Sequence, residues 1–134
     1  MKFFRILILT VGVVALCVVC QSRPDVEAEG QKYLKRARIF LQRGAMDEAK
    51  ALVDSLRVHC PMAFNAREDG IILIDSINLI ESRQELDSLE HFLNTAELTR
   101  IGKDTIDFKH DELRQKVRFF EKKIQHDQQN KIKH

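Results

Sequence analysis

Residues 33–56 read YLKRARIFLQRGAMDEAKALVDSL, and their spacing decides the fold. Apolar side chains recur every three or four residues on both sides of Gly44, as they do on the buried faces of amphipathic helices. The expected packing positions are Tyr33, Ala37, Phe40 and Leu41 in the first helix and Ala49, Leu52, Val53 and Leu56 in the second. Gly44 is expected to end the first helix, and the second is expected to run from Ala45 to His59. The stretch therefore predicts a helical hairpin.

Prolines mark the outer boundaries of this hairpin. The first helix is expected to begin near Pro24, a favourable residue in a first helical turn. Asp25, Glu27 and Glu29 follow it and complement the positive end of the helix dipole. Pro61 is expected to end the second helix and to start a third.

The second half of the chain predicts two long antiparallel helices. A helix is expected over residues 62–98, with a break at Gly70 or at residues 82–84 left open. Residues Gly102 to Asp107 are expected to form the connection, with Asp107 as the N-cap of the last helix. The last helix carries an apolar stripe that is expected to pack against Leu86, Leu89 and Leu93, and the stripe consists of Leu113, Val117, Phe120 and Ile124.

These segments together predict an all-α fold in a single domain over residues 21–134. Residues 30–63 form the first hairpin, 64–128 form an antiparallel, coiled-coil-like hairpin, and 129–134 form a polar tail. Trp is absent, and the chain has only 5 Gly and 2 Pro, which favours long helices over strands. Asp75 and Ser82 fall at seam positions of the long helix and argue against an uninterrupted zipper.

The N-terminal segment has the pattern of a secretory signal. Met1 to Arg5 is short and basic, and the run Ile6 to Val19 is apolar. That run has about 14 residues, whereas a helix that crosses a bilayer needs about 20. No Ala-x-Ala-like cleavage site follows, and Cys20 ends the run before polar residues begin.

This arrangement resembles the signal of bacterial lipoproteins, in which a cysteine is acylated and becomes the mature N-terminus. The resemblance implies residues 1–20 as the signal, lipidation of Cys20 with Cys17 as the alternative, and a membrane-anchored place in the bacterial cell envelope, on the periplasmic or outer-surface face. An uncleaved short anchor and an ordinary cleaved signal remain the other interpretations. Cys60 is then the one cysteine of the folded part and has no internal disulfide partner.

The charge balance argues against a nucleic-acid partner. Lys2 and Arg5 are two of the 22 basic residues, and the remaining 20 balance the 20 acidic residues. Nucleic-acid binders instead carry a concentrated basic surface. Basic residues do gather in the C-terminal helix, but acidic residues among them offset the charge.

Residues 30–63 resemble one tetratricopeptide repeat, a helix–turn–helix unit with large and small residues at fixed positions. The matching positions are Tyr33, Ala37, Phe40, Gly44, Ala49, Val53, Leu56 and Pro61. The next 34 residues do not repeat the pattern. A single unit cannot build the concave groove of longer arrays, so the resemblance implies a fold and no ligand. The chain also resembles small helical envelope lipoproteins of Bacteroidetes-type bacteria. The segment that carries this resemblance is Arg118-Phe119-Phe120-Glu121-Lys122-Lys123-Ile124.

Candidate chemical residues fit structural roles better than catalytic ones. His110-Asp111 and His126-Asp127 have no ligand partner at three or four residues, so no metal site is expected. Neighbours such as His59 and Cys60 point in different directions on a helix, so no thiol–imidazole pair is expected. The chain has no nucleophile elbow and no phosphate-binding loop. The sequence therefore predicts a protein that is not an enzyme and takes no cofactor.

The remaining function is a lipid-anchored interaction or scaffold protein with a protein partner. Phe119 lies beside the apolar stripe of the last helix, and Phe119, Arg118 and Lys122 are the expected interaction surface. The alternative is a structural coiled-coil spacer of the envelope. Self-association into a homo-oligomer is left open.

Overall fold

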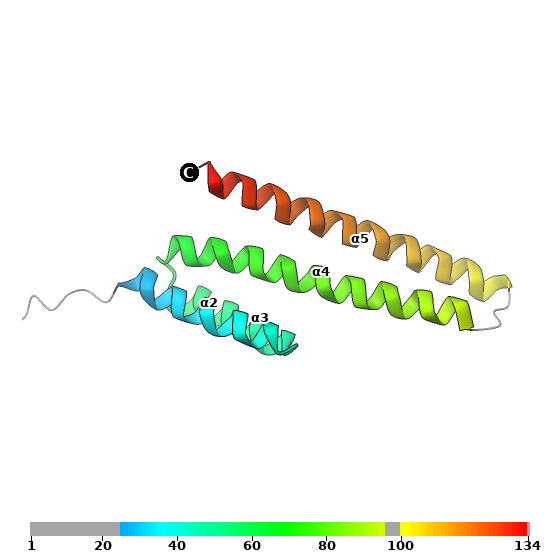
Figure 1. Ribbon diagram of the computed structural model, residues 1–134, viewed down its shortest axis with the longest axis horizontal. Coiled ribbons are helices and arrows are strands. Elements are labelled where there is room, and N and C mark those ends of the chain that lie inside the picture. The colour runs from blue at the N-terminus through cyan, green and yellow to red at the C-terminus, as the bar shows by residue number, and fades with distance from the viewer. Residues whose placement is uncertain (1–24, 96–99, 134) are drawn as a thin grey trace, which may run out of the picture.

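The protein is described here by a computed structural model that covers residues 25–95 and 100–133. These residues contain four helices and no strand: α2 (Val26–Gln42), α3 (Met46–His59), α4 (Phe64–Thr95) and α5 (Arg100–Ile132). In Figure 1, α2 and α3 lie against the first half of α4, and α5 returns along α4 from the far end. The predicted all-α fold, a helix hairpin followed by two long antiparallel helices, is confirmed.

Polar and glycine caps define both ends of α2. One carboxylate oxygen of Asp25 accepts hydrogen bonds from the backbone N–H groups of Glu27, at 3.1 Å, and Ala28, at 3.2 Å. At the other end, Gly44 has a φ of 77°, a left-handed conformation that glycine adopts without strain. The N–H groups of Gly44 and Ala45 donate to the last turn of the helix, as in a Schellman motif. The predicted end at Gly44 is confirmed.

The turn between α3 and α4 is tied to α2. The backbone N–H of Ala66, in the first turn of α4, donates to Oε1 of Glu27 at 2.7 Å. Glu27 therefore caps a helix 39 residues further along the chain. The sequence predicted only a dipole role for Glu27 in its own helix, because no local pattern announces a cap supplied from another helix.

The main core lies between α2, α3 and the first half of α4. Its buried members are Leu34, Ala37, Ala49, Val53, Leu56, Cys60, Ala63, Ala66, Leu73 and Ile77. Sequence reasoning overlooked Leu34 and selected its neighbour Tyr33, which is only partly buried. Gly30 marks the closest approach of the helices, since a Cβ there would stand 2.7 Å from Cβ of Ala63.

The helix α4 is continuous over 32 residues, so neither of the breaks left open occurs. Gly70 is buried, and its missing side chain leaves room for Val53 and Leu56 of α3. The Ser82 hydroxyl donates to the carbonyl of Asn78 at 2.7 Å, so this buried polar group has a partner inside the helix. The predicted helical state of Ile71 to Ile74 is confirmed.

The predicted connection is wrong, and α5 extends into the segment predicted as a polar tail. The helix α4 ends at Thr95 and α5 begins at Arg100, so Gly102 and Asp107 lie inside α5, and Asp107 is not an N-cap. One glycine costs a helix about 1 kcal/mol, which the many turns that follow outweigh. The helix also continues to Ile132 through the supposed tail, where Lys131 pairs with Asp69 of α4. Residues 96–98 of the expected third helix lie outside the described residues.

Cross-helix ion pairs mark the register of the α4–α5 hairpin. Glu121 of α5 pairs with Arg83 at 2.7 Å, and His110 pairs with Glu90 at 3.0 Å. Leu113 is buried at 2% exposure, as predicted for the stripe, and it lines a groove together with Gln84, Glu85 and Ser88 of α4.

Candidate interaction surface

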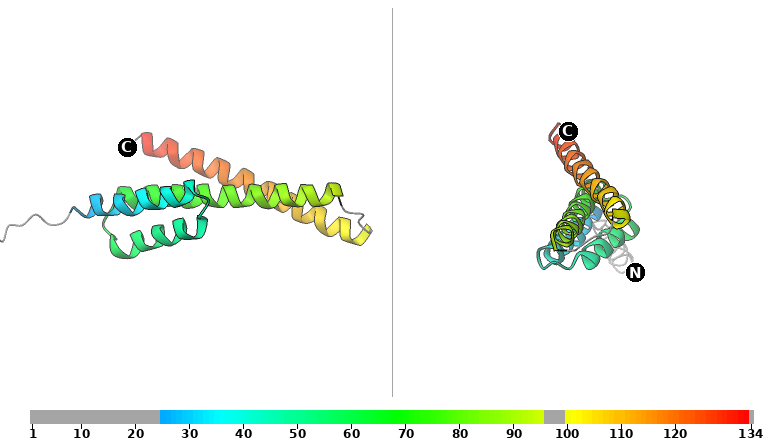
Figure 2. Two further views of the ribbon diagram at one scale, coloured as in Figure 1. Left: turned by 60° about the horizontal axis from the view of Figure 1, so that its bottom comes forward. Right: turned by 90° about the vertical axis from the view of Figure 1, so that its right-hand side faces the viewer.

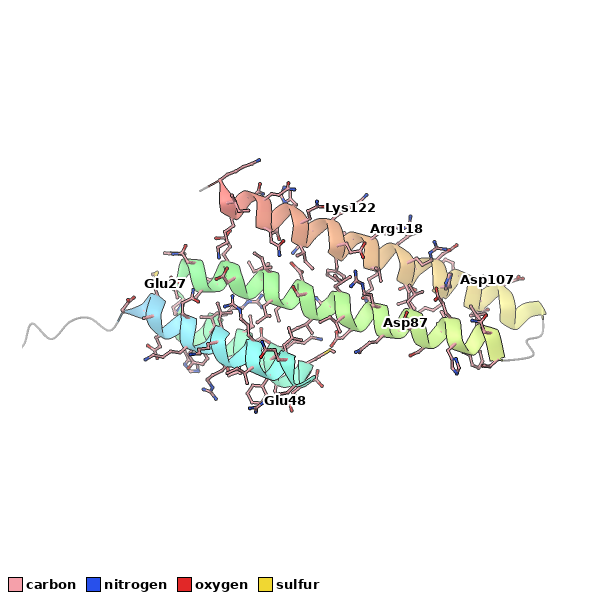
Figure 3. The ribbon with its side chains drawn as sticks, in the orientation of Figure 1. Glu27, Glu48, Asp87, Asp107, Arg118 and Lys122 are labelled. Carbon is pink, nitrogen blue, oxygen red and sulfur yellow. The ribbon has the colours of Figure 1, made fainter. Side chains whose placement is uncertain are left out.

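The predicted surface on α5 is accessible. Arg118, Phe119 and Lys122 are all exposed, and 58% of Phe119 is open to solvent. Figure 3 shows the side chains of Arg118 and Lys122 extending from α5 on the side away from α4. These three residues thus form an aromatic and basic patch on the outer face of the last helix.

The two adjacent phenylalanines divide between the seam and this patch. Phe120 is half-buried toward α4, and the Phe119 ring meets its edge at a centroid distance of 5.3 Å and an interplanar angle of 71°. This edge-to-face geometry is favourable for aromatic pairs. The exposed Phe119 ring is thus in contact with a ring that is itself half-buried.

Arg118 is also positioned by its own helix. Its Nε donates to the carbonyl of Arg114 at 3.4 Å, which lays the guanidinium along the helix surface. The nearby carboxylate of Glu121 is engaged by Arg83 on α4.

Two further exposed phenylalanines lie toward the loop end of the same hairpin, and sequence reasoning missed them. Phe108 is 75% exposed on α5, and Phe92 is 47% exposed on α4. Phe108 precedes Phe119 by three helical turns and so lies on nearly the same face of α5. The spacing of Phe108 and Phe119 in the sequence was the signal that would have identified Phe108.

A broad groove of about 710 Å³ lies between α4 and α5 beyond the end of the first hairpin. It is lined by Glu81, Gln84, Glu85, Ser88, Lys109 and Leu113. Glu81 already accepts two hydrogen bonds from Lys50 of α3, at 2.6 and 2.8 Å. The groove is an open surface channel between two helices, and Leu113 is the one apolar side chain among the described residues that line it.

The residues considered for catalysis or metal binding have other partners. His110 contacts Glu90, and His126 contacts Asp127 and Asn130. The described part of the chain contains no group of three or more His, Cys, Asp or Glu side chains arranged to hold a metal ion. His59 stacks on Tyr33, with ring centroids 6.1 Å apart. Cys60 is buried, and that burial, followed by the charge of Glu29, raises the pKa of its thiol.

An ion pair that contains a nearly buried carboxylate crosses the α4–α5 seam. Asp75 is only 6% exposed and pairs with Lys123, which also lies 3.6 Å from Asp127. The hydrogen bond to Asp75 raises the pKa of Lys123, although desolvation opposes it. Asp75, which the sequence placed at a seam position, therefore faces a cation that only the folded chain brings to it.

Comparisons with protein-family models, curated proteins and solved structures find no match to this chain. Among the residues the structure describes, no helix has the length and apolar character needed to cross a bilayer. The predicted lipidation residues, Cys20 and Cys17, lie outside the described residues.

Proposed function

We propose that this chain is a lipid-anchored protein of the bacterial cell envelope that binds another protein through the outer face of α5 and performs no catalysis. The observation that carries the proposal is the exposed patch of Arg118, Phe119 and Lys122 on a rigid helix. Aromatic and arginine side chains are enriched at protein–protein interfaces and contribute much of their binding energy.

The arrangement of the helices supports this division of roles. The hairpin of α2 and α3 covers only the first half of α4, and the second half of α4 extends beyond it with α5 (Figure 2). Phe92 and Phe108 add aromatic surface to this extension. The first hairpin, with its resemblance to one tetratricopeptide unit, serves in this proposal as the base of the molecule and not as a peptide groove.

The anchor is proposed from the apolar run that ends at Cys20, with Cys17 as the alternative. Metabolic labelling with a fatty-acid probe tests it. Cys20→Ser should abolish labelling, and loss of labelling only in Cys17→Ser would move the modification to Cys17. Labelling that persists in both single variants and in the double variant would rule out a lipoprotein.

Photo-crosslinking in intact envelopes tests the interaction patch. A photoreactive residue at Gln115, which is exposed near Phe119 on α5, should form a discrete adduct with one partner protein. Phe119→Asp should remove the adduct without changing helicity, because Phe119 is exposed. Lys32→Asp, on the exposed surface of α2, is the matched control and should retain the adduct. An adduct that survives Phe119→Asp would show that the patch is not the binding surface.

A structural spacer is the second candidate, favoured by the continuity of α4 and α5. A 32-residue helix is about 48 Å long, and α5 braces α4 along much of that length. A spacer needs defined length and self-association more than a partner patch. The mass of the purified protein in detergent separates the two, since a discrete oligomer unaffected by Phe119→Asp favours the spacer.

A further inference from the structure

Three large apolar side chains are exposed at and beside the turn that joins α3 to α4. Val58 is 73% exposed, Met62 is 68% exposed and Phe64 is 67% exposed. Their neighbours Cys60, Ala63 and Ala66 are fully buried and make the contacts that hold the turn to the core. We propose that this apolar turn, defined by Val58, Met62 and Phe64, inserts into the surface of the bilayer that holds the acylated cysteine.

The apolar turn lies at the end of the molecule where α2 begins. The Ala66 N–H donates to Glu27 in the first turn of α2 at 2.7 Å, and Gly30 lies in close contact with Ala63. Figures 1 and 2 both show the start of α2 beside the start of α4. The turn and Asp25 therefore share one end of the rod-shaped helical body.

The chain between the anchor and this end is short. Five peptide steps separate Cys20 from Asp25, so they span at most about 17–18 Å even when fully extended. This inference rests on the proposed lipidation, which would place Cys20 at the membrane surface. Given that anchor, the start of α2 cannot move far from the headgroup region, and the apolar turn is held at the same height.

Several polar groups of the turn are paired within the protein, whereas Nε of Arg67 is buried without a hydrogen-bond partner among the described residues. The carbonyl of Pro61 accepts a hydrogen bond from Nη1 of Arg67 at 2.8 Å. The N–H of Ala63 donates to Cys60, and the N–H of Phe64 donates to Met62. Backbone groups satisfied within the protein lower the cost of entering an apolar phase, and side chains at the headgroup boundary gain from burying apolar surface there.

Tryptophan fluorescence tests the proposal because the chain contains no native tryptophan. Mature, acylated Met62→Trp and Phe64→Trp proteins are placed in vesicles of phosphatidylethanolamine and phosphatidylglycerol whose acyl chains carry bromine. The indole emission should be blue-shifted. It should also be several-fold weaker in the brominated vesicles than in unbrominated vesicles of the same lipids. Phe108→Trp, an exposed site at the opposite end of the helical body, is the matched control and should show neither effect.

The possible failures are distinguishable. Acylated protein that co-sediments with vesicles while its Met62→Trp and Phe64→Trp indoles remain as exposed as the Phe108→Trp indole would overturn the insertion and leave the anchor standing. A blue shift without bromine quenching would mean that protein, not lipid, covers the turn, and would also overturn it. Failure of the protein to acquire lipid or to co-sediment would overturn both the anchor and this inference.

Discussion

Gly30 lies where α2 meets the turn into α4, and its lack of a side chain permits that contact. A Cβ at this position would stand 2.7 Å from Cβ of Ala63 and 2.8 Å from Cβ of Ala66. Both neighbours are fully buried and held by the backbone of the turn, so neither has a flexible end that could move aside. The residue is therefore required for packing, even though alanine is a better helix former.

We expect Gly30→Ala to lower the free energy of unfolding by about 1–3 kcal/mol, the usual cost of overpacking a core. Urea denaturation followed by circular dichroism measures the change. Ala28→Ser, on the exposed face of the same helix, is the control and should change stability by less than about 0.5 kcal/mol. A more stable Gly30→Ala protein would mean that the helices move apart at little cost. The higher helix propensity of alanine would then determine the stability effect at this position.

The raised pKa values of Cys60 and Lys123 lead us to expect a loss of stability at alkaline pH. Burial raises the pKa of the Cys60 thiol, and the hydrogen bond to Asp75 raises the pKa of Lys123. The folded protein thus holds both protons more tightly than the unfolded chain. Their contributions are complete at neutral pH and are lost as pH rises above about 8.5, first through the thiol and then through the ammonium.

Urea midpoints measured between neutral pH and pH 10.5 should therefore fall on the alkaline side. Cys60→Ala should be less stable at neutral pH, because it leaves a cavity, but should lose less on going to pH 9.5. A wild-type midpoint that stays constant across this range would contradict the prediction.

At the scale of helices, the seam between α4 and α5 combines apolar residues with two buried polar ones. Ser82 satisfies its hydroxyl within α4, whereas Asp75 depends on Lys123, 48 residues later. The sequence identified both residues as interruptions of a zipper, because their seam positions follow from helical spacing alone. It could not identify Lys123 as the partner, because the position of the loop sets the register and Gly102 suggested the wrong loop.

We expect Lys123→Met to lower the free energy of unfolding by about 1–3 kcal/mol, because the Asp75 carboxylate would lose its partner in a nearly buried place. The expected loss is smaller than that for a fully buried ion pair, since the Lys123 side chain is 35% exposed. Chemical denaturation at neutral pH measures it.

Two further variants make this test specific. Lys122→Met changes the same residue type at the exposed neighbouring position and should alter stability by less than about 0.5 kcal/mol. Adding Asp75→Leu to Lys123→Met should recover much of the loss, because apolar residues can replace a buried pair at little cost. Equal effects of Lys122→Met and Lys123→Met would mean that the ion pair contributes nothing to stability.

At the scale of the whole molecule, packing is unequal along the rod. The first half of α4 has α2 and α3 on one side and α5 on the other, whereas the second half packs only against α5. In that second half, Leu86, Leu89 and Leu93 are only half-buried. The distal part of the hairpin should therefore open locally at lower free energy than the three-helix base.

Native-state hydrogen exchange should reveal this gradient. Amides around Leu34, Val53 and Ile77 should exchange at least about tenfold more slowly than those in residues 86–93, because their opening requires disruption of the core. Residues 107–112, which also lie in the distal hairpin, should exchange as fast as residues 86–93. Uniform protection along α4 would show that the whole molecule opens as one unit.

Sequence periodicity predicted the helices and the first hairpin well, because their apolar faces and their breaker at Gly44 are local features. It failed at Gly30, Glu27 and Lys123, whose roles come from contacts between distant segments. For the interaction surface, it found Phe119 by its place beside the seam. It overlooked Phe92 and Phe108, because their exposure depends on where the first hairpin ends and α5 begins.

The position of α4 between two hairpins has a kinetic consequence. Each of its packing partners lies close to it in the chain: α2 and α3 precede it, and α5 follows it. The closing loops are therefore short, and little chain entropy has to be lost before native contacts form. Folding should be fast, and either hairpin can nucleate first on the same central helix. The half made of α2, α3 and the start of α4 can form its core before α5 packs, and the pairs of Asp75 with Lys123 and Asp69 with Lys131 are added when the last helix arrives.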